Sequence, residues 1–389
     1  MRILVSGLIG TYPLGGVAWD YLQFISGLVA LGCEVTYLED AGLWVYHPQL
    51  QTFTDDGSEN VRYLQRVLAT VPGMESSFAF RDLRGILHGL SEEELQRRCR
   101  EADLLLNVSG VLWPRDVYRE ARVMAYYDSD PLYIQAEVMA AKEGKGTEAQ
   151  QGDVGWFWKH DVFFTMAENI HDPSCLIPDC GVDWKTTRQP ITLADWPVTY
   201  DEHAKNFTTV MSWKTQPALP VVGGRVYGGK DVEFLRFKQL PRMVSSPLEV
   251  ALSGATAPRE DLAREGWILV DAIERSSTMG RYRDYIGVSR GEWSIAKEAY
   301  VATESGWFSC RSACYLAMGK PVVVEETGIS RHYRTGEGIW TFRSLEEAAA
   351  AIDAINANYR QQCEAARAMA EYYFRAETVL EQLLRDAGF

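Results

Sequence analysis

The 389-residue sequence has no Cys-x-x-Cys pair, no apolar run long enough to cross a membrane and no surplus of basic residues. A membrane helix needs about 20 consecutive apolar residues, so no membrane span is expected. The net charge of −14 makes nucleic acid an unlikely partner, because its binders usually carry a basic surplus. Seven cysteines, an odd number, predict reduced thiols and a cytoplasmic protein.

Two nucleotide-binding fingerprints are also missing from the glycine-rich segment at 7–16. Its glycines do not have the G-x-G-x-x-G spacing of a dinucleotide site, and the Gly-Lys-Ser/Thr of a P-loop is absent. A nicotinamide dehydrogenase is therefore disfavoured. The segment still opens a strand–helix–strand unit of Rossmann type. Small residues there let a ligand or a facing domain approach the backbone. The candidate ligand-binding residues of the segment are Gly10, Gly15 and Gly16.

The order of the predicted elements indicates an α/β protein with two sheets. A polar stretch at 185–205 separates the opening strand–helix series from a second series and predicts a linker. Strands of the second series are expected at 207–211, 248–252, 267–270, 285–288, 322–324 and 339–342. We expect one domain at 1–200, a second at 201–345 and C-terminal helices at 346–389, for which a return to the first domain is one arrangement.

Residues 303–328 predict a turn, a short helix, a second turn and a strand. Ser309 is placed to cap the helix, and Gly319 to end it. The start of such a helix presents free backbone N–H groups and a positive dipole end, to which Arg311 and Ser312 add side-chain donors. Two interpretations stay open, an anion site and an ordinary helix-to-strand unit of a parallel sheet.

Acidic and histidine residues near strand ends are candidates for acid–base chemistry. Asp128 and Asp130 follow a strand predicted at 122–127. They could hold a divalent metal through a diphosphate, or form an Asp-rich turn, and we favour a loop facing an interdomain cleft. His160, His171 and Asp172 are further candidates for a general base, although an isolated histidine is more often structural.

Most of the chain resembles glycosyltransferases of the GT-B fold, and more narrowly a bacterial glycosyltransferase family distantly similar to the CgeB-like group. The matching segments are YYDSDP (126–131), HDVFFTMAENI (160–170), IPDCGVDWKTTRQPITLADWP (177–197), FTTVMSWK (207–214), YGGKDVEF (227–234), YIGVSRGEWSIAKEAYVATESGWFSCRSACYLAMGKPVVVEETG (285–328) and TGEG (335–338).

This resemblance implies two Rossmann-like domains facing each other across a cleft. The C-terminal domain would hold a nucleotide-diphosphate sugar, and the N-terminal domain most of the acceptor. Implied donor contacts are Ser212, Lys214 and Lys230 for phosphates, Trp307, Phe308, Ser309, Arg311 and Ser312 for the diphosphate, and Glu326, Thr327 and Gly328 for sugar or ribose. Many retaining members carry two glutamates eight positions apart; the matching positions here are Gly306 and Cys314, so the stereochemistry stays open.

Glycosyl transfer needs stabilisation of the departing diphosphate and of an oxocarbenium-like centre. Fixed N–H groups and cations would meet the first need without a metal or another cofactor. An inverting reaction would also need a base, for which Asp128, Asp130 and His171 are the candidates. We therefore expect transfer of a hexosyl or related sugar to an unidentified small molecule or glycan. A nucleotide-sugar epimerase and a non-catalytic sugar-nucleotide binder are the alternatives, and the oligomeric state is open.

Overall fold

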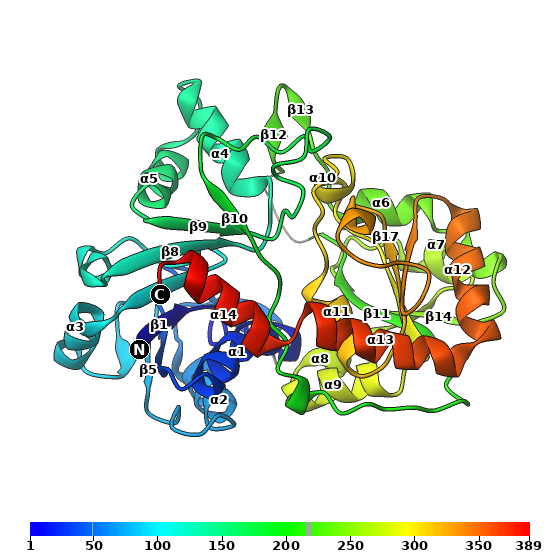
Figure 1. Ribbon diagram of the computed structural model, residues 1–389, viewed down its shortest axis with the longest axis horizontal. Helices are drawn as coiled ribbons and strands as arrows, with labels where there is room; N and C mark the ends of the chain where they lie inside the picture. The colour runs from blue at the N-terminus through cyan, green and yellow to red at the C-terminus, as the bar shows by residue number, and fades with distance from the viewer. Residues whose placement is uncertain (49, 215–218) are drawn as a thin grey trace.

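The computed structural model describes residues 1–48, 50–214 and 219–389 and contains two α/β halves, each built on a parallel sheet (Figure 1). The predicted fold class is confirmed. Among the described residues, no helix combines the length and the apolar character that crossing a membrane requires.

The first half is an eight-stranded sheet of order β10-β9-β8-β7-β1-β2-β5-β6, parallel except for the last pair. Its strands are β1 (Arg2–Ser6), β2 (Glu34–Glu39), β5 (Phe78–Arg81), β6 (Leu87–Gly89), β7 (Leu104–Val108), β8 (Val123–Asp128), β9 (Val162–Thr165) and β10 (Trp184–Thr186). The helices are α1 (Gly15–Ala30), α2 (Ser58–Leu68), α3 (Glu92–Glu101), α4 (Tyr133–Lys142) and α5 (Glu148–Phe157), and a hairpin forms from β3 (Val45–His47) and β4 (Thr52–Thr54).

The second half is a six-stranded parallel sheet of order β15-β14-β11-β16-β17-β18. Its strands are β11 (Phe207–Ser212), β14 (Leu248–Ser253), β15 (Ile268–Asp271), β16 (Gly291–Ser294), β17 (Val322–Glu325) and β18 (Ile339–Phe342). The helices that accompany it are α6 (Lys230–Arg236), α7 (Arg259–Glu265), α8 (Ala272–Ser276), α9 (Met279–Gly287), α10 (Glu298–Val301), α11 (Cys310–Ala317), α12 (Leu345–Ala357) and α13 (Tyr359–Tyr373), and β12 (Val221–Val222) pairs with β13 (Arg225–Val226).

The strand expected at 285–288 is wrong. Residues 279–287 form α9, whose N-cap Thr278 accepts a hydrogen bond from the amide of Arg281. Tyr282, Tyr285 and Ile286 are buried at helical spacing, which explains the apolar run. The strand is β16, which begins four residues after the end of α9, and its fully buried sequence GEWS contains two polar side chains. Polar residues in a buried strand hide it from an apolar-run criterion.

The C-terminal helices connect the halves. Helix α13 packs on α11, and α14 (Ala376–Asp386) lies on α1 of the first half (Figure 1). The contact with α14 is close, because a Cβ added at Gly27 would lie 2.4 Å from Leu380 Cδ1. Where the chain returns, the amide of Ile191 donates to Phe374 and the amide of Ala376 donates to Ile191. The two connections between the halves are therefore bonded to each other.

Candidate functional site

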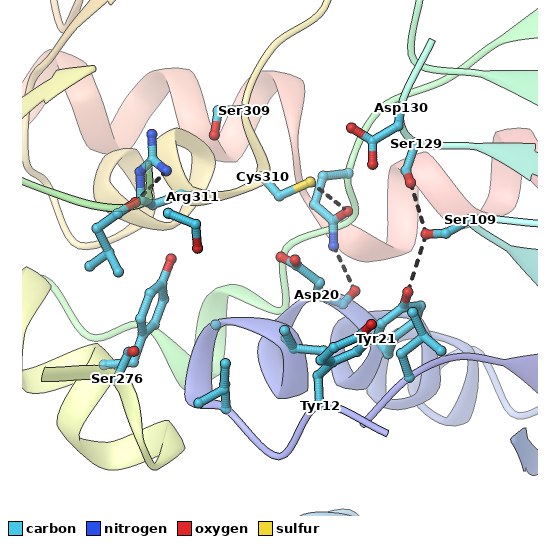
Figure 2. A pocket seen from close by; sticks show the side chains of 18 of the residues that line it. Tyr12, Asp20, Tyr21, Ser109, Ser129, Asp130, Ser276, Ser309, Cys310 and Arg311 are labelled. Carbon is cyan, nitrogen blue, oxygen red and sulfur yellow. Dashed lines mark hydrogen bonds between the residues drawn. The ribbon is translucent and has the colours of Figure 1, made fainter. Parts of the chain in front are cut away.

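A cavity of about 400 Å³ lies between the two sheets (Figure 2). Its walls include residues that follow the carboxyl ends of β7, β8 and β15, and the last residues of β11 and β14. Ligands of open α/β sheets bind at this end of the strands. Of the predicted site residues, the cavity brings together Gly16, Asp130, Ser212, Lys230, Trp307, Ser309 and Arg311.

The N-terminus of α11 forms one wall. Ser309 is the N-cap, in extended conformation, and its hydroxyl accepts no capping hydrogen bond, so it stays available to a ligand. Ser309, Cys310 and Arg311 line the cavity. The turn before α11 needs Gly306, which has a φ of +75° and approaches Asn169 so closely that a Cβ would lie 2.8 Å from its amide nitrogen. This arrangement supplies the unpaired N–H groups and dipole of an anion site.

Arg311 is held by the protein rather than free to grip a ligand. Its Nε lies 2.5 Å from Oε1 of the buried Glu292, and Nη1 donates to the carbonyl of Val210 at 2.8 Å. Nη2 donates to Ser294 Oγ. Figure 2 shows the guanidinium directed at the backbone of β11. Arg311 thus forms a compensated pair at the helix N-terminus, and its predicted contact with a diphosphate stays a prediction.

Lys230 lines the cavity and, within the part of the chain that the structure describes, has no ion-pair partner. Among the described residues, no carboxylate lies within ion-pair distance of its ammonium and no hydrogen bond from it is found. Burial, followed by the charges of Arg311 and Lys297, lowers the pKa of Lys230 from 10.5 to about 7. Lys214, in contrast, does not line the cavity; its side chain is 62% exposed and lies 3.5 Å from Asp231.

Asp20 on α1 is a site residue that the sequence analysis did not select. Its side chain lines the cavity opposite α11 (Figure 2). Burial raises the pKa of Asp20 from 3.8 to about 7; Arg311 and Lys230 oppose that rise and Asp130 adds to it. The available signal was its position, because Asp20 lies between Val17 and Phe24, three residues after one and four before the other, on one helix face that lines the cavity.

Two of the predicted catalytic residues, Asp128 and His171, lie outside the cavity lining. Asp128 is buried and does not line the cavity, and its Oδ2 accepts hydrogen bonds from Gln135 and Thr165. Burial raises its pKa to about 6. His171 is an exposed residue outside the cavity, with Nε2 2.9 Å from the carbonyl oxygen of Trp184. Neither residue lines this cavity in the structure, so their catalytic roles stay predictions.

Asp130 lines the cavity, but its carboxylate is paired across the two halves. Oδ1 lies 2.6 Å from Lys297 Nζ and also accepts a hydrogen bond from Tyr300. Burial tends to raise the pKa of Asp130, but Lys297 and Tyr300 outweigh it and the pKa ends below its ordinary value. Asp130 is therefore a weak base and an interdomain contact.

The glycine-rich loop is filled by the protein itself. Buried Glu39 accepts hydrogen bonds from the amides of Gly10 and Thr11 and from the hydroxyl of Tyr37. The amide of Gly10 is thus bonded within the protein, and Gly10 does not line the cavity. Gly15 touches the second half, since a Cβ there would lie 2.2 Å from the carbonyl oxygen of Thr278. Close approach of the domains, one of the two uses expected for this loop, accounts for Gly15.

The remaining predicted donor contacts divide into two groups. Ser212 lines the cavity and accepts a hydrogen bond from Ser253, while the indole N–H of Trp307 donates to the carbonyl of Ser129 in the other half. The second group does not line the cavity. Ser312 is buried within α11, and the others are buried in the turns around α11 and β17; they are Phe308, Glu326, Thr327 and Gly328. Gln189, not predicted, bridges the cavity: its Nε2 donates to the carbonyl of Asp20 and its Oε1 lies 3.2 Å from Cys310 Sγ.

Within the described residues, no three His, Cys, Asp or Glu side chains gather as metal ligands would. The carboxylates of Asp128 and Asp130 are engaged separately, by neutral donors in one case and by Lys297 and Tyr300 in the other.

The whole chain is similar in structure to solved glycosyltransferases. HepE from Anabaena, solved with UDP-glucose, has a TM-score of 0.58 at 12% identity, covering 99% of this chain and 98% of that one. AviGT4, a glycosyltransferase involved in avilamycin A biosynthesis, has a TM-score of 0.54 at 14% identity, covering 100% and 97%. An alpha-glucosyltransferase with UDP and a 13-mer DNA containing an HMU base has a TM-score of 0.56 at 10% identity, covering 100% of both chains.

Neither a protein-family model nor a curated protein matches the chain. At the identities given above, the structural likeness establishes the fold. The chain has the GT-B fold, with two Rossmann-like domains facing each other across a cleft, as the sequence resemblance implied.

Proposed function

We propose that the protein is a glycosyltransferase that moves a sugar from a nucleotide diphosphate to a hydroxyl group of an acceptor. The observation that carries the proposal is the arrangement of the interdomain cavity. An available lysine and a helix N-terminus lie on one wall, and a carboxylate with a pKa near neutrality lies on the other.

The diphosphate would lie at the start of α11. The N–H groups of the first turn, the hydroxyl of Ser309 and the ammonium of Lys230 would bind its oxygens, while the ion pair of Arg311 with Glu292 fixes the helix start. These groups would stabilise the charge that accumulates on the diphosphate as its bond to the sugar breaks. We propose that no metal is needed, since cations and backbone amides supply this stabilisation.

Asp20 would act as the general base of an inverting transfer. Its carboxylate takes the proton of the acceptor hydroxyl as the hydroxyl oxygen attacks the anomeric carbon. The bond from that carbon to the diphosphate oxygen breaks, and its electron pair stays on the departing diphosphate. A base is most effective when its pKa lies near the working pH, and the pKa of Asp20 is about 7. Lys230 would pair with the leaving group, and Asp20 would pair with the acceptor hydroxyl. The two side chains would thus divide stabilisation of the diphosphate and removal of the proton between them.

The proposal includes a uridine-diphosphate sugar as the first donor to test, because HepE and the alpha-glucosyltransferase were solved with UDP-glucose or UDP. It also includes residues 1–200 as the acceptor-side domain and residues 201–345 as the donor domain. The seven cysteines form no disulfide, which supports a reducing compartment such as the cytoplasm.

A thermal-shift panel of UDP-, GDP-, dTDP- and ADP-sugars tests the donor assignment, because a ligand that binds the native state raises apparent stability. One nucleotide series should stabilise the protein, and the stabilising nucleotide sugar should then be hydrolysed or transferred. Reversible change of the sugar alone would indicate an epimerase. Binding without any turnover would indicate a binding protein.

A further inference from the structure

The wall of the cavity that comes from the first half is largely apolar, although Asp20, Ser109, Ser129, Asp130 and Gln189 also line it. Its carbon-rich side chains are Leu8, Tyr12, Leu14, Val17, Tyr21, Phe24, Val108 and Tyr127. The opposite wall also has apolar side chains, among them Val210, Met211 and Ile273, but it carries the polar groups Ser212, Lys230, Ser253 and Ser309, while Arg311 is engaged by Glu292. The two substrates of a transfer reaction would therefore meet surfaces of different chemistry.

Most polar groups on the apolar wall are bonded to the protein. The hydroxyl of Ser129 donates to Ser109, and Tyr21 donates to the same Ser109 oxygen. The hydroxyl of Tyr127 donates to the carbonyl of Arg188, and Asp130 is paired with Lys297. A sugar or an oligosaccharide presents many hydroxyl groups, and each that is buried without a partner costs free energy. This wall suits an acceptor with few polar groups.

The apolar wall continues outside the cavity onto the β3–β4 hairpin. Tyr12 lines the cavity and meets the ring of Phe53 edge-on, with ring centroids 6.2 Å apart. Phe53 is 52% exposed and also packs against Tyr46 at 5.4 Å. The hairpin is fixed to the loop before α1, because the amide of Tyr46 donates to the carbonyl of Thr11. An aromatic surface thus runs from the cavity to solvent.

The size of the cavity and the charge around the hairpin further restrict the class of molecule that can bind. A cavity of about 400 Å³ holds about one drug-sized molecule, so an acceptor that shares it with a nucleotide sugar must extend outward. The chain from 43 to 58, which carries the hairpin, contains no lysine or arginine and includes Asp55 and Asp56. Arg84 pairs with Asp56 at 2.9 Å, so the positive charge beside this segment is compensated and offers little to an anionic polymer or an anionic lipid surface.

We propose that the acceptor is an uncharged, hydroxyl-bearing molecule with an apolar ring system. Its hydroxyl enters the cavity beside Asp20, and its rings lie over Tyr12 and Phe53. This inference rests on the proposed function, of which it names the acceptor class.

Calorimetric titration of the protein with 2-naphthol tests the inference without any donor. We expect binding with a negative heat-capacity change, the signature of apolar burial. Binding of 6-hydroxynaphthalene-2-sulfonate, of the same ring size but charged, should be at least tenfold weaker. Maltotriose and a 13-mer single-stranded DNA should show no binding. Tighter binding of the sulfonate, the glycan or the DNA would overturn the inference.

Two variants of the exposed Phe53 locate the site. Phe53→Asp should weaken 2-naphthol binding about tenfold or more and leave UDP binding unchanged, while the apolar Phe53→Leu should stay within about threefold of the wild type. If both variants bind 2-naphthol like the wild type, the rings do not lie over the hairpin and the inference is wrong. Intact binding and hydrolysis of a nucleotide sugar, with no binding of 2-naphthol, would refute the acceptor class alone. Absence of any nucleotide-sugar binding would refute the proposed function instead.

Discussion

Lys230→Met tests the proposal that the cavity holds a diphosphate. The change keeps most of the length of the side chain and removes its charge. A hydrogen bond that involves a charged group contributes about 1.5–3 kcal/mol. Its loss corresponds to a roughly 10- to 150-fold rise in the Kd of UDP-glucose. Lys214→Met is the matched control, because Lys214 is exposed and outside the cavity, and its Kd should stay within about threefold.

The same substitution should stabilise the empty protein. The pKa of Lys230 is lowered in the folded state from 10.5 to about 7, so the native state holds this proton less tightly than the unfolded chain. The resulting penalty is full below pH 7 and disappears as the pH rises from 7 to 10.5. At pH 6, Lys230→Met should raise the free energy of unfolding by about 1–3 kcal/mol, a figure discounted for the partial exposure of the lysine side chain. A weaker ligand affinity combined with a higher Tm cannot be explained by a damaged fold.

The pH dependence of donor binding completes this test. A UDP-sugar has no phosphate that titrates near neutrality, and an ammonium is needed at its diphosphate. Above pH 7 the Kd should therefore rise by up to tenfold per pH unit in the wild type and stay flat in Lys230→Met. Asp20 titrates in the same range, so the comparison belongs in an Asp20→Asn background. Calorimetry measures each Kd, and an unchanged Kd in Lys230→Met would refute the assignment of Lys230 to the diphosphate.

Three further predictions concern turnover. Asp20→Asn should lower kcat about 10²- to 10⁴-fold, leave the donor Kd little changed and remove the rise of activity with pH through pH 7. It should also raise Tm at pH 8, because burial penalises the ionised Asp20 carboxylate there. A kcat equal to that of the wild type would exclude Asp20 as the base. Asp130→Asn should lower Tm at pH 7, because the lowered pKa of Asp130 stabilises the fold above pH 4 and that gain is lost as pH falls; a loss of kcat equal to that of Asp20→Asn would transfer the base role to Asp130. EDTA should leave the transfer rate unchanged, and a loss of activity that Mn²⁺ restores would show a metal requirement.

The sequence predicts much of the fold because the parallel strands are buried and apolar. The α11 turn was also predictable, since Ser309, Gly319 and the following apolar strand are local signals. β16 was not, because two of its four residues are polar and are buried only through contacts distant in sequence. One of them, Glu292, is the partner of Arg311.

The pairing of the site residues could not be predicted without β16. Without β16, Arg311 looks like an unpaired cation, and its pairing with Glu292 becomes visible only in the folded sheet. In the same way, Lys297 of the second half forms an ion pair with Asp130 of the first half. Asp20 had a local signal, a carboxylate on an apolar helix face, but only the facing domain turns that face into a cavity wall.

The central claim is that the start of α11 and Lys230 hold a diphosphate in the interdomain cavity. A crystal structure with UDP-glucose at saturating concentration tests it most directly. We predict phosphate oxygens within about 3.2 Å of the first-turn amides of α11 and of Lys230 Nζ, with the sugar facing Asp20. A nucleotide bound at the loop of residues 7–16, or anywhere outside this cavity, would contradict the account.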